Sequence, residues 1–256
     1  MDLQDKVAVI TGGASGLGRA TTEEMISRGA KVMIFDLNED LGKSVSEELG
    51  DSVSFVQVNV ADEESVQNGI AKTVETFGTI HICVNCAGIG SAMKTYSKKG
   101  PHNLGLFQTV INVNLVGTFN VLRLSAEVMA KNEPLTDDGE RGVIINTASV
   151  AAFDGQVGQV AYSASKGGVV GMTLPIARDL APVGIRINVI APGIFNTPLM
   201  NMAPDAVKLP LIEMTQFPKR LGNPSEYAQM ACQMVENTFL NGEVIRVDGS
   251  IRMHAR

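Results

Sequence analysis

The stretch KVAVITGGASGLGRA, residues 6–20, decides the fold. It begins with a short β-branched run, KVAVIT (6–11), of the kind that forms a buried strand. The glycine-rich turn TGGASGLG (11–18) follows, and then a helical pattern that runs from about Leu17 to Arg28 and stops at Gly29. A strand, a glycine-rich turn and a helix in this order predict the opening of a βαβ unit that binds a nucleotide phosphate.

The same alternation continues along the chain. Amphipathic stretches such as NEDLGKSVSEEL (38–49), a helix opened by Asp62 and another that starts at PSEYAQM (224–230) separate short apolar runs. These runs, each a predicted strand, lie at 31–35, 53–58, 80–85, 142–147, 186–190 and 243–247. Alternating strands and helices form right-handed crossovers over a parallel sheet. We therefore expect an α/β fold, a Rossmann-type doubly wound parallel sheet of about seven strands with helices on both faces.

Length and composition predict a single domain. The chain has 256 residues, of which 45% are hydrophobic, so it can bury a large core as one unit, residues 1–256. Segments 90–105 and 131–142 look like polar loops, and 192–224 like a long irregular segment. Because such a segment after the sixth strand suits a mobile cover, we expect a substrate lid at about 195–223.

Charge and cysteine content argue against several classes of protein. The net charge is −6 and the basic residues are scattered, which disfavours direct nucleic-acid binding. Cys83 and Cys86 form a C-x-x-C motif, but on a strand they would point to opposite faces, and the three histidines are dispersed, so no metal site is expected.

No apolar run approaches the roughly 20 residues of a membrane span. The opening MDLQDK does not resemble a cleavable presequence, which leaves a cytoplasmic protein or an import signal inside the folded chain.

The glycine-rich turn and the acid after the second strand point to NAD. Gly12, Gly16 and Gly18 are spaced G-x-x-x-G-x-G, which lets the backbone approach a pyrophosphate at a helix N-terminus. Asp36 ends the second strand, where a carboxylate can accept both ribose hydroxyls and would repel a 2′-phosphate. Neither Ser15 nor Leu37 supplies a cation for such a phosphate. The alternative is that Asp36 is simply a solvated acid at the end of a strand.

Tyr162 and Lys166, in AYSASKGG (161–168), lie four residues apart among small side chains. On a helix this spacing places a phenol and an ammonium on one face. Taken alone, the pair could share that face by chance.

Six features occur together along the chain: TGGASGLG, VNCAG (84–88), VNL (113–115), Ser149 thirteen residues before Tyr162, YSASK (162–166) and APG (191–193). Their order and spacing resemble the short-chain dehydrogenase/reductase family over essentially the whole chain. Longer stretches, such as RGVIINTASVAAFDGQVGQ (141–159) and LNGEVIRVDG (240–249), resemble a mitochondrial branch of that family which oxidises 3-hydroxyacyl-CoA thioesters and hydroxysteroids.

The resemblance implies a catalytic set of Tyr162, Lys166, Ser149 and Asn114. Tyr162 would accept the substrate's hydroxyl proton, and Lys166 would lower the phenol's pKa and bind the nicotinamide ribose. Ser149 would hydrogen-bond the substrate oxygen, and Asn114 would hold a water that connects Lys166 to bulk solvent. The structural alternatives are a buried Ser at a strand end and an Asn within a helix.

The resemblance also implies cofactor and substrate contacts. Asn59 stands where the family usually has Asp, although its carbonyl can still accept a hydrogen bond, and Cys86 replaces a more common Asn. Gln156 is the candidate for holding the acyl or keto group, together with Ser149 and Tyr162. The implied NAD contacts are Gly12, Ser15, Gly16, Leu17, Gly18, Asp36, Asn59, Val60, Cys86, Ala87, Gly88, Tyr162, Lys166, Phe195 and Thr197.

Three functions follow as hypotheses. The first is NAD-dependent oxidation of 3-hydroxyacyl-CoA to 3-oxoacyl-CoA in fatty-acid and branched-chain catabolism, extending to hydroxysteroids. The second is a structural subunit of a mitochondrial tRNA-processing complex beside a tRNA methyltransferase, and the third is a polyol or sugar dehydrogenase. The resemblance further implies a homotetramer in the mitochondrial matrix.

Overall fold

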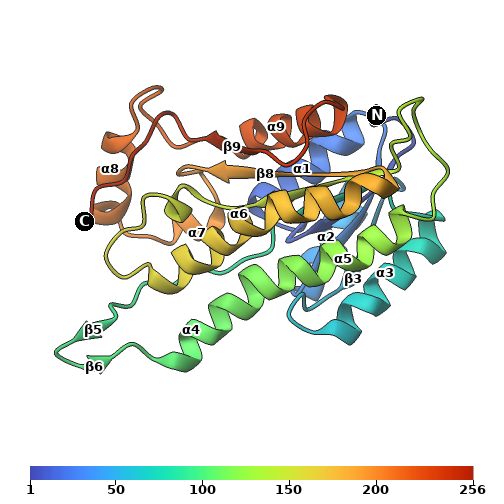
Figure 1. Cartoon of the computed structure of the whole chain (residues 1–256). Coiled ribbons are helices and arrows are strands. Elements are labelled where there is room, and N and C mark those ends of the chain that lie inside the picture. Colours follow the sequence, from blue (N-terminus) through green and yellow to red (C-terminus); the bar gives the residue numbers. More distant parts are fainter. Residues whose placement is uncertain (256) are drawn as a thin grey trace.

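Within residues 1–255, which the computed structural model describes, seven parallel strands form one sheet in the order β3-β2-β1-β4-β7-β8-β9 (Figure 1). The strands are β1 (Val7–Thr11), β2 (Lys31–Asp36), β3 (Val53–Gln57), β4 (Ile82–Asn85), β7 (Gly142–Thr147), β8 (Ile185–Pro192) and β9 (Val244–Val247). All seven predicted strands are confirmed to within about two residues. The order reverses between β1 and β4, and this switch point is where doubly wound sheets bind ligands.

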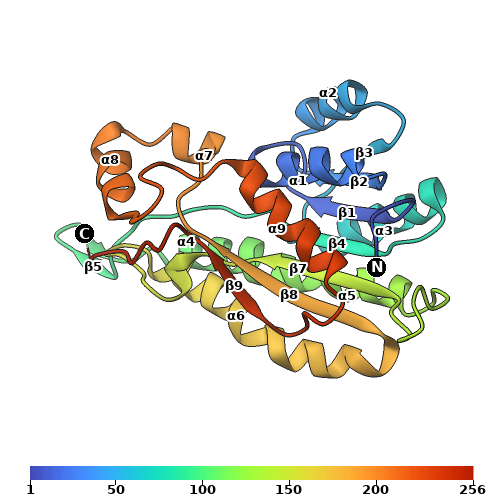
Figure 2. The ribbon, with the colours of Figure 1, turned by 90° about the horizontal axis from the view of Figure 1, so that it is seen from above.

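Helices cover both faces of the sheet, as predicted (Figure 2). Side chains of α1 (Gly16–Ser27), α2 (Glu39–Leu49) and α9 (Pro224–Glu236) form one core with Ala8, Ile10 and Ile34. Side chains of α3 (Glu63–Phe77), α5 (Gly117–Met129) and α6 (Val160–Leu180) form the other core with Val9, Met33 and Phe35. The alternation along β1 and β2 therefore divides the apolar side chains between two cores.

The C-x-x-C motif is split by the same alternation. Cys83 is buried in the core beneath α3 and α5, whereas Cys86 packs against the opposite core. Both are free cysteines. The strand geometry expected from the sequence is thus confirmed, and the two sulfurs lie on different sides of the sheet.

One helix corrects the expectation about membrane-spanning length. A π-helical segment, Asn112–Val116, joins α4 (Leu104–Ile111) to α5, so residues Leu104–Met129 form a continuous apolar helix of 26 residues that is long enough to span a membrane. Its inner face, however, packs against the sheet through Val121, Leu122 and Met129. The length and apolar character follow from this core position, because a helix that packs on a sheet is rich in apolar residues.

The segments expected to be irregular contain more structure than predicted. Residues 90–105 include a small antiparallel hairpin, β5 (Tyr96–Ser97) and β6 (Gly100–Pro101), and the segment after β8 contains α7 (Pro198–Asn201) and α8 (Asp205–Met214). Both views place the hairpin, α8 and the C-terminal tail at the same end of the molecule (Figures 1 and 2). Pro210 inside α8 masks that helix in the sequence, because proline is unfavourable in a helix interior.

A buried ion pair fastens the opposite end of β8. The Arg186 Nη2 and Nε atoms lie 2.7 and 2.8 Å from Glu140 Oε1, and the side chains are only 8% and 6% exposed. Arg186 also donates to the carbonyls of Met234, Val235 and Leu240 at the end of α9 and beyond. The other Glu140 oxygen accepts from the Met1 ammonium at 2.9 Å. Arg186 therefore ties β8 to the end of α9, and the Glu140 carboxylate neutralises its buried charge.

Replacing Glu140 with Gln should lower the free energy of unfolding by about 3–5 kcal/mol, because Arg186 would remain buried without a counter-charge. Urea unfolding followed by circular dichroism would measure the loss. The matched control is Glu75→Gln, since Glu75 pairs with Lys72 on the surface at 70% exposure, and it should change the free energy by about 0.5 kcal/mol or less. Equal effects at the two positions would contradict this account.

Candidate active site

A cavity of about 620 Å³ opens at the carboxyl ends of the strands. This volume is within the range of small-molecule sites. With one exception, Asn114, the predicted site residues all line it. These are Gly12, Ser15, Gly16, Leu17, Gly18, Asp36, Asn59, Val60, Cys86, Ala87, Gly88, Ser149, Gln156, Tyr162, Lys166, Phe195 and Thr197. Residues from 12 to 197 in the sequence therefore converge on one space.

The N-terminus of α1 borders this cavity with its backbone N–H groups uncapped. Its N-cap residue Ser15 makes no side-chain capping bond, and the first turn contains no acidic residue. By contrast, Asn38 and Asp62 cap α2 and α3, and both helices carry acids in the first turn. Free N–H groups and an uncompensated helix dipole attract an anion such as a phosphate.

Two glycines make the close approach at this turn possible. Gly16 has a φ of +53°, a backbone conformation that is strained for any residue with a Cβ. A Cβ at Gly18 would collide with the Gly12 carbonyl oxygen. The turn therefore packs α1 tightly against the end of β1, as the sequence predicts for a phosphate-binding turn.

Asp36 closes β2 next to this turn. Its carboxylate accepts from the Ala14 N–H at 3.2 Å and from the Asn38 N–H at 3.1 Å. These bonds fix the carboxylate at the cavity wall, and Leu37 beside it is 65% exposed and uncharged. The arrangement suits a ribose with free hydroxyls and provides no cation for a 2′-phosphate.

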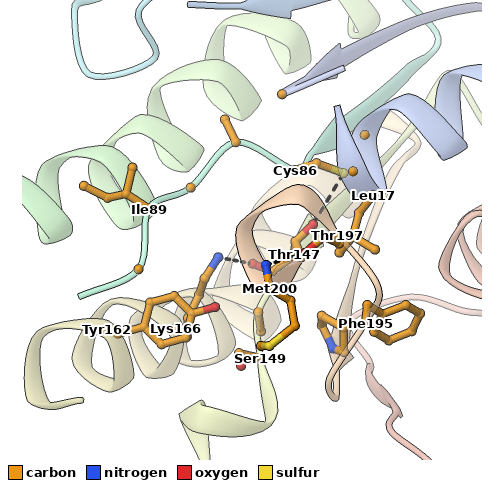
Figure 3. A pocket seen from close by; sticks show the side chains of 18 of the residues that line it. Leu17, Cys86, Ile89, Thr147, Ser149, Tyr162, Lys166, Phe195, Thr197 and Met200 are labelled. Carbon is orange, nitrogen blue, oxygen red and sulfur yellow. Dashed lines mark hydrogen bonds between the residues drawn. The ribbon is translucent and has the colours of Figure 1, made fainter. Parts of the chain in front are cut away.

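Tyr162, Lys166 and Ser149 face the same part of the cavity (Figure 3). Tyr162 and Lys166 lie on successive turns of α6, and the Lys166 ammonium is 5.8 Å from the centre of the Tyr162 ring. The ammonium donates to the Thr147 carbonyl at 2.8 Å. Ser149 caps the short 3₁₀ turn Val150–Ala152, where its hydroxyl accepts from the Ala151 N–H at 3.1 Å. A phenol, an ammonium and a hydroxyl are thus gathered on one wall.

Burial controls the proton equilibria of this group. Burial raises the pKa of Tyr162, and a hydrogen bond with Ser149 offsets part of the rise. Burial also lowers the pKa of Lys166 to about 8. The Lys166 ammonium donates to the Thr147 carbonyl, and that its charge lowers the pKa of Tyr162 during catalysis stays a prediction.

Asn114 lies behind the cavity rather than in its wall. It is fully buried in the π-helical segment, where its amide donates to Ser165 Oγ at 3.1 Å and to the Ile89 carbonyl at 2.9 Å. Its Oδ1 accepts from the Ile89 N–H at 2.8 Å. A Cβ at Gly88 would lie 3.2 Å from that Oδ1 and 3.5 Å from Lys166 Nζ. Asn114 thus fixes the segment after β4 beside Lys166, and its link to a water stays a prediction.

Sequence reasoning missed a polar cluster behind Lys166. Tyr227 on α9 is fully buried, and its hydroxyl lies 2.6 Å from Thr147 Oγ1 and 3.6 Å from Cys86 Sγ. Thr147 also donates to Cys86 at 3.7 Å (Figure 3). Thr147, whose carbonyl accepts from Lys166, is therefore anchored through its own side chain. The only sequence signal was a tyrosine on the apolar face of a predicted helix, which usually indicates plain packing.

The far end of the cavity is apolar and is formed partly by the C-terminal tail. Met200 on α7, Leu211 on α8 and Met253 in the tail line it beside Gln156. Gln156 Nε2 donates to the His254 carbonyl at 3.0 Å, so the tail also holds the residue predicted to contact substrate. Met253 lay outside every motif and could not have been assigned from the sequence. That residues 195–223 move as a lid stays a prediction.

Lys166→Met should change how folding stability depends on pH. The pKa of Lys166 is about 8 in the folded protein, against a reference value of 10.5. Below pH 8 the buried lysine is charged, and the full cost of that buried charge lowers the stability of the folded protein. That cost, on the order of 1–3 kcal/mol, disappears as pH rises toward 10.5. The free energy of unfolding of the wild type should therefore rise relative to the variant between pH 8 and 10. Urea titrations across this range would measure it, and a constant difference would contradict the assignment.

Comparison with known proteins shows which family the chain belongs to. The model of the short chain dehydrogenase family matches residues 6–207. The 3-hydroxyacyl-CoA dehydrogenase type-2 of Bos taurus is 57% identical over 249 residues, covering 96% of this chain and 95% of that one. The protein of the same name from Drosophila melanogaster is 55% identical over 253 residues, covering 98% and 99%.

A solved structure is similar as well. The crystal structure of 3-hydroxyacyl-CoA dehydrogenase type-2 from Mycobacterium avium matches with a TM-score of 0.93 and 40% identity, covering 99% of each chain. The family model matches well over half of the chain, and these relatives cover nearly all of it. The chain therefore belongs to the short-chain dehydrogenase family.

Proposed function

We propose that this protein oxidises the 3-hydroxyl of 3-hydroxyacyl-CoA thioesters to the ketone, with NAD as the hydride acceptor. The observation that carries the proposal is that Tyr162, Lys166 and Ser149 share one cavity with an uncapped helix N-terminus and Asp36. The relatives with 55–57% identity bear the name of this activity.

The residues present fit NAD. The α1 N-terminus would hold the pyrophosphate, Asp36 the adenosine ribose, and Lys166 the nicotinamide ribose. Phe195 and Thr197, which also line the cavity, would border the nicotinamide end. When bound, NAD supplies the electrophilic ring that takes up the substrate hydride.

The chain's own residues would handle the alcohol proton. Ser149 would orient the substrate oxygen by a hydrogen bond, and Tyr162 would take the hydroxyl proton as general base. Because burial raises the pKa of Tyr162, the phenol keeps its proton at neutral pH. Positive charge nearby would lower that pKa and favour the phenolate, which is the form that acts as the base. The Lys166 ammonium supplies part of that charge from one helical turn away.

The apolar end of the cavity supports an acyl substrate. Val150, Met200, Leu211 and Met253 present hydrocarbon and thioether surface, which suits a fatty or branched acyl chain and also the ring system of a hydroxysteroid. A polyol would leave its additional hydroxyls against this wall without partners. The polyol or sugar dehydrogenase alternative is therefore less well supported.

We further propose a homotetramer in the mitochondrial matrix, on the family resemblance of the sequence. Exposed apolar side chains on neighbouring helices, including Val116, Phe119 and Leu174, support association of subunits. Assembly with a tRNA methyltransferase remains a proposal that rests on the resemblance alone, and it would be compatible with catalysis.

Tyr162→Phe should lower kcat/KM for 3-hydroxybutyryl-CoA by at least about 10³-fold, because the general base is lost. NADH binding, measured by nicotinamide fluorescence, should change by less than about threefold, since only one hydroxyl is removed. The matched control is Tyr96→Phe in the hairpin, where the tyrosine is 75% exposed and the change should leave activity intact. Activity of the wild type on small polyols but on no thioester would contradict the substrate assignment.

Asp36→Ala should reverse part of the preference for NAD over NADP. Removing the carboxylate loses the hydrogen bonds to the ribose and the repulsion of a 2′-phosphate. The dissociation constant for NADPH divided by that for NADH should therefore fall about tenfold or more. Calorimetric titration with NADH and NADPH would measure both constants. Asp51→Ala, in an exposed turn, is the control of equal charge change. An unchanged ratio would show that Asp36 is only a solvated acid.

A further inference from the structure

A second cavity lies beside the apolar end of the active-site cavity. Its volume is about 500 Å³, and Gln156 and Leu211 line both cavities, so the two spaces share a wall. Lys94 contributes one charge to the second cavity. The other apolar side chains that line it are those of Val157, Ala206, Pro210, Met214 and Ala255.

The C-terminal tail runs between the two cavities. Met253 lines the first cavity, and Ala255, two residues later, lines the second. The carbonyl of His254 accepts from Gln156 Nε2 at 3.0 Å. The carbonyl of Ala255 accepts from the Val157 N–H at 3.0 Å. The tail is therefore bonded to the segment at 156–157 and forms a partition there.

This partition is held in place on both sides of Met253. Before it, Ile251 is fully buried, and its carbonyl accepts from Arg246 Nη2 at 2.9 Å. Arg246 is itself fixed by an ion pair with Asp154 at 2.8 Å. After Met253, the His254 N–H donates to the sulfur of Met214 on α8 at 3.5 Å. Because the backbone is tied on both sides, the side chain at position 253 is a fixed part of the cavity wall.

The acyl chain of the proposed substrate would end at this wall. If the proposed function holds, the dinucleotide occupies the cavity from Asp36 to Lys166, and the reacting carbon lies beside Tyr162. The charged CoA portion stays in solvent, because burying its phosphates without partners is costly. The hydrocarbon end is therefore the part of the substrate that suits the apolar wall of Leu211 and Met253.

We propose that Met253 sets the upper length of the acyl chain by closing the first cavity against the second. A short chain ends before the Met253 side chain. A longer chain collides with it, and would enter the second cavity only past a smaller side chain. This inference rests on the proposed function and adds a specificity-determining residue to it, since Met253 meets the end of the chain and not the reacting atoms.

The test compares 3-hydroxybutyryl-CoA and 3-hydroxydecanoyl-CoA as substrates of the wild type and of Met253→Ala, at saturating NAD. The quantity measured is kcat/KM for the decanoyl thioester divided by kcat/KM for the butyryl thioester. This ratio should rise about tenfold or more in the variant, because the additional methylene groups gain apolar space in which to be buried.

Two controls separate selection by length from a general loosening of the site. Met202→Ala removes the same side chain at a position just after α7 that is 78% exposed, and its ratio should equal that of the wild type. Met253→Leu approximately conserves the side-chain volume, so its ratio should stay within about threefold of the wild type. Circular dichroism would check that each variant is folded. Met253→Val is a smaller truncation that should raise the ratio in the same direction, and it serves as the test if the alanine variant does not fold.

The outcomes distinguish this proposal from the proposed function. An unchanged ratio in Met253→Ala and Met253→Val, with 3-hydroxybutyryl-CoA still oxidised by the wild type, would overturn the role of Met253 and leave the proposed function intact. A wild type with equal kcat/KM for both thioesters would have the same consequence. If the wild type oxidises neither thioester, both proposals fail.

Discussion

The buried ammonium of Lys166 is the constraint around which this site is built. Burial lowers the pKa of an ammonium group unless a partner stabilises its charge. Here the partner is the Thr147 carbonyl rather than a carboxylate. That carbonyl is at the end of β7, and its residue is anchored by the Tyr227 hydroxyl from the opposite face of the sheet. Moving any of these elements would leave the ammonium unpaired. The lysine therefore requires a rigid sheet edge, and the same rigidity fixes Tyr162 on the neighbouring turn of α6.

The two halves of the cavity follow from the order of the strands. Going outward from β1, β2 and β3 present Asp36 and Asn59, while β4, β7 and β8 present Gly88, Ser149 and the segment that starts at Gly193. Parallel strands all end at one edge, so each βα connection contributes to the same groove. The polar features that select a dinucleotide lie on one side, and the groups able to act on an alcohol lie on the other. This separation explains how cofactor choice and substrate choice can change independently in such a fold.

Three features of the structure were not evident from the sequence. The segment after β8 contains α7 and α8, and Pro210 inside α8 masks that helix in the sequence. Asn114 lies behind the cavity, where its side chain bonds Ile89 and Ser165. Burial raises the pKa of Tyr162, while the Lys166 ammonium donates to the Thr147 carbonyl. Residue spacing carries no information on desolvation or on hydrogen bonds across the fold.

The sequence by itself predicted the seven strands, the parallel doubly wound topology and the phosphate turn. These depend on periodicity, on glycine at close approaches and on residue type at strand ends, all of which are local properties. The family resemblance added most of the candidate site residues that line the cavity. Only the tertiary structure revealed that Met253 forms part of the wall, that the tail around it lies between two cavities, and that Tyr227 supports Lys166 through Thr147. Each of these depends on contacts between segments that fold together, since hydrogen-bond direction and burial are fixed by neighbours that local sequence does not specify.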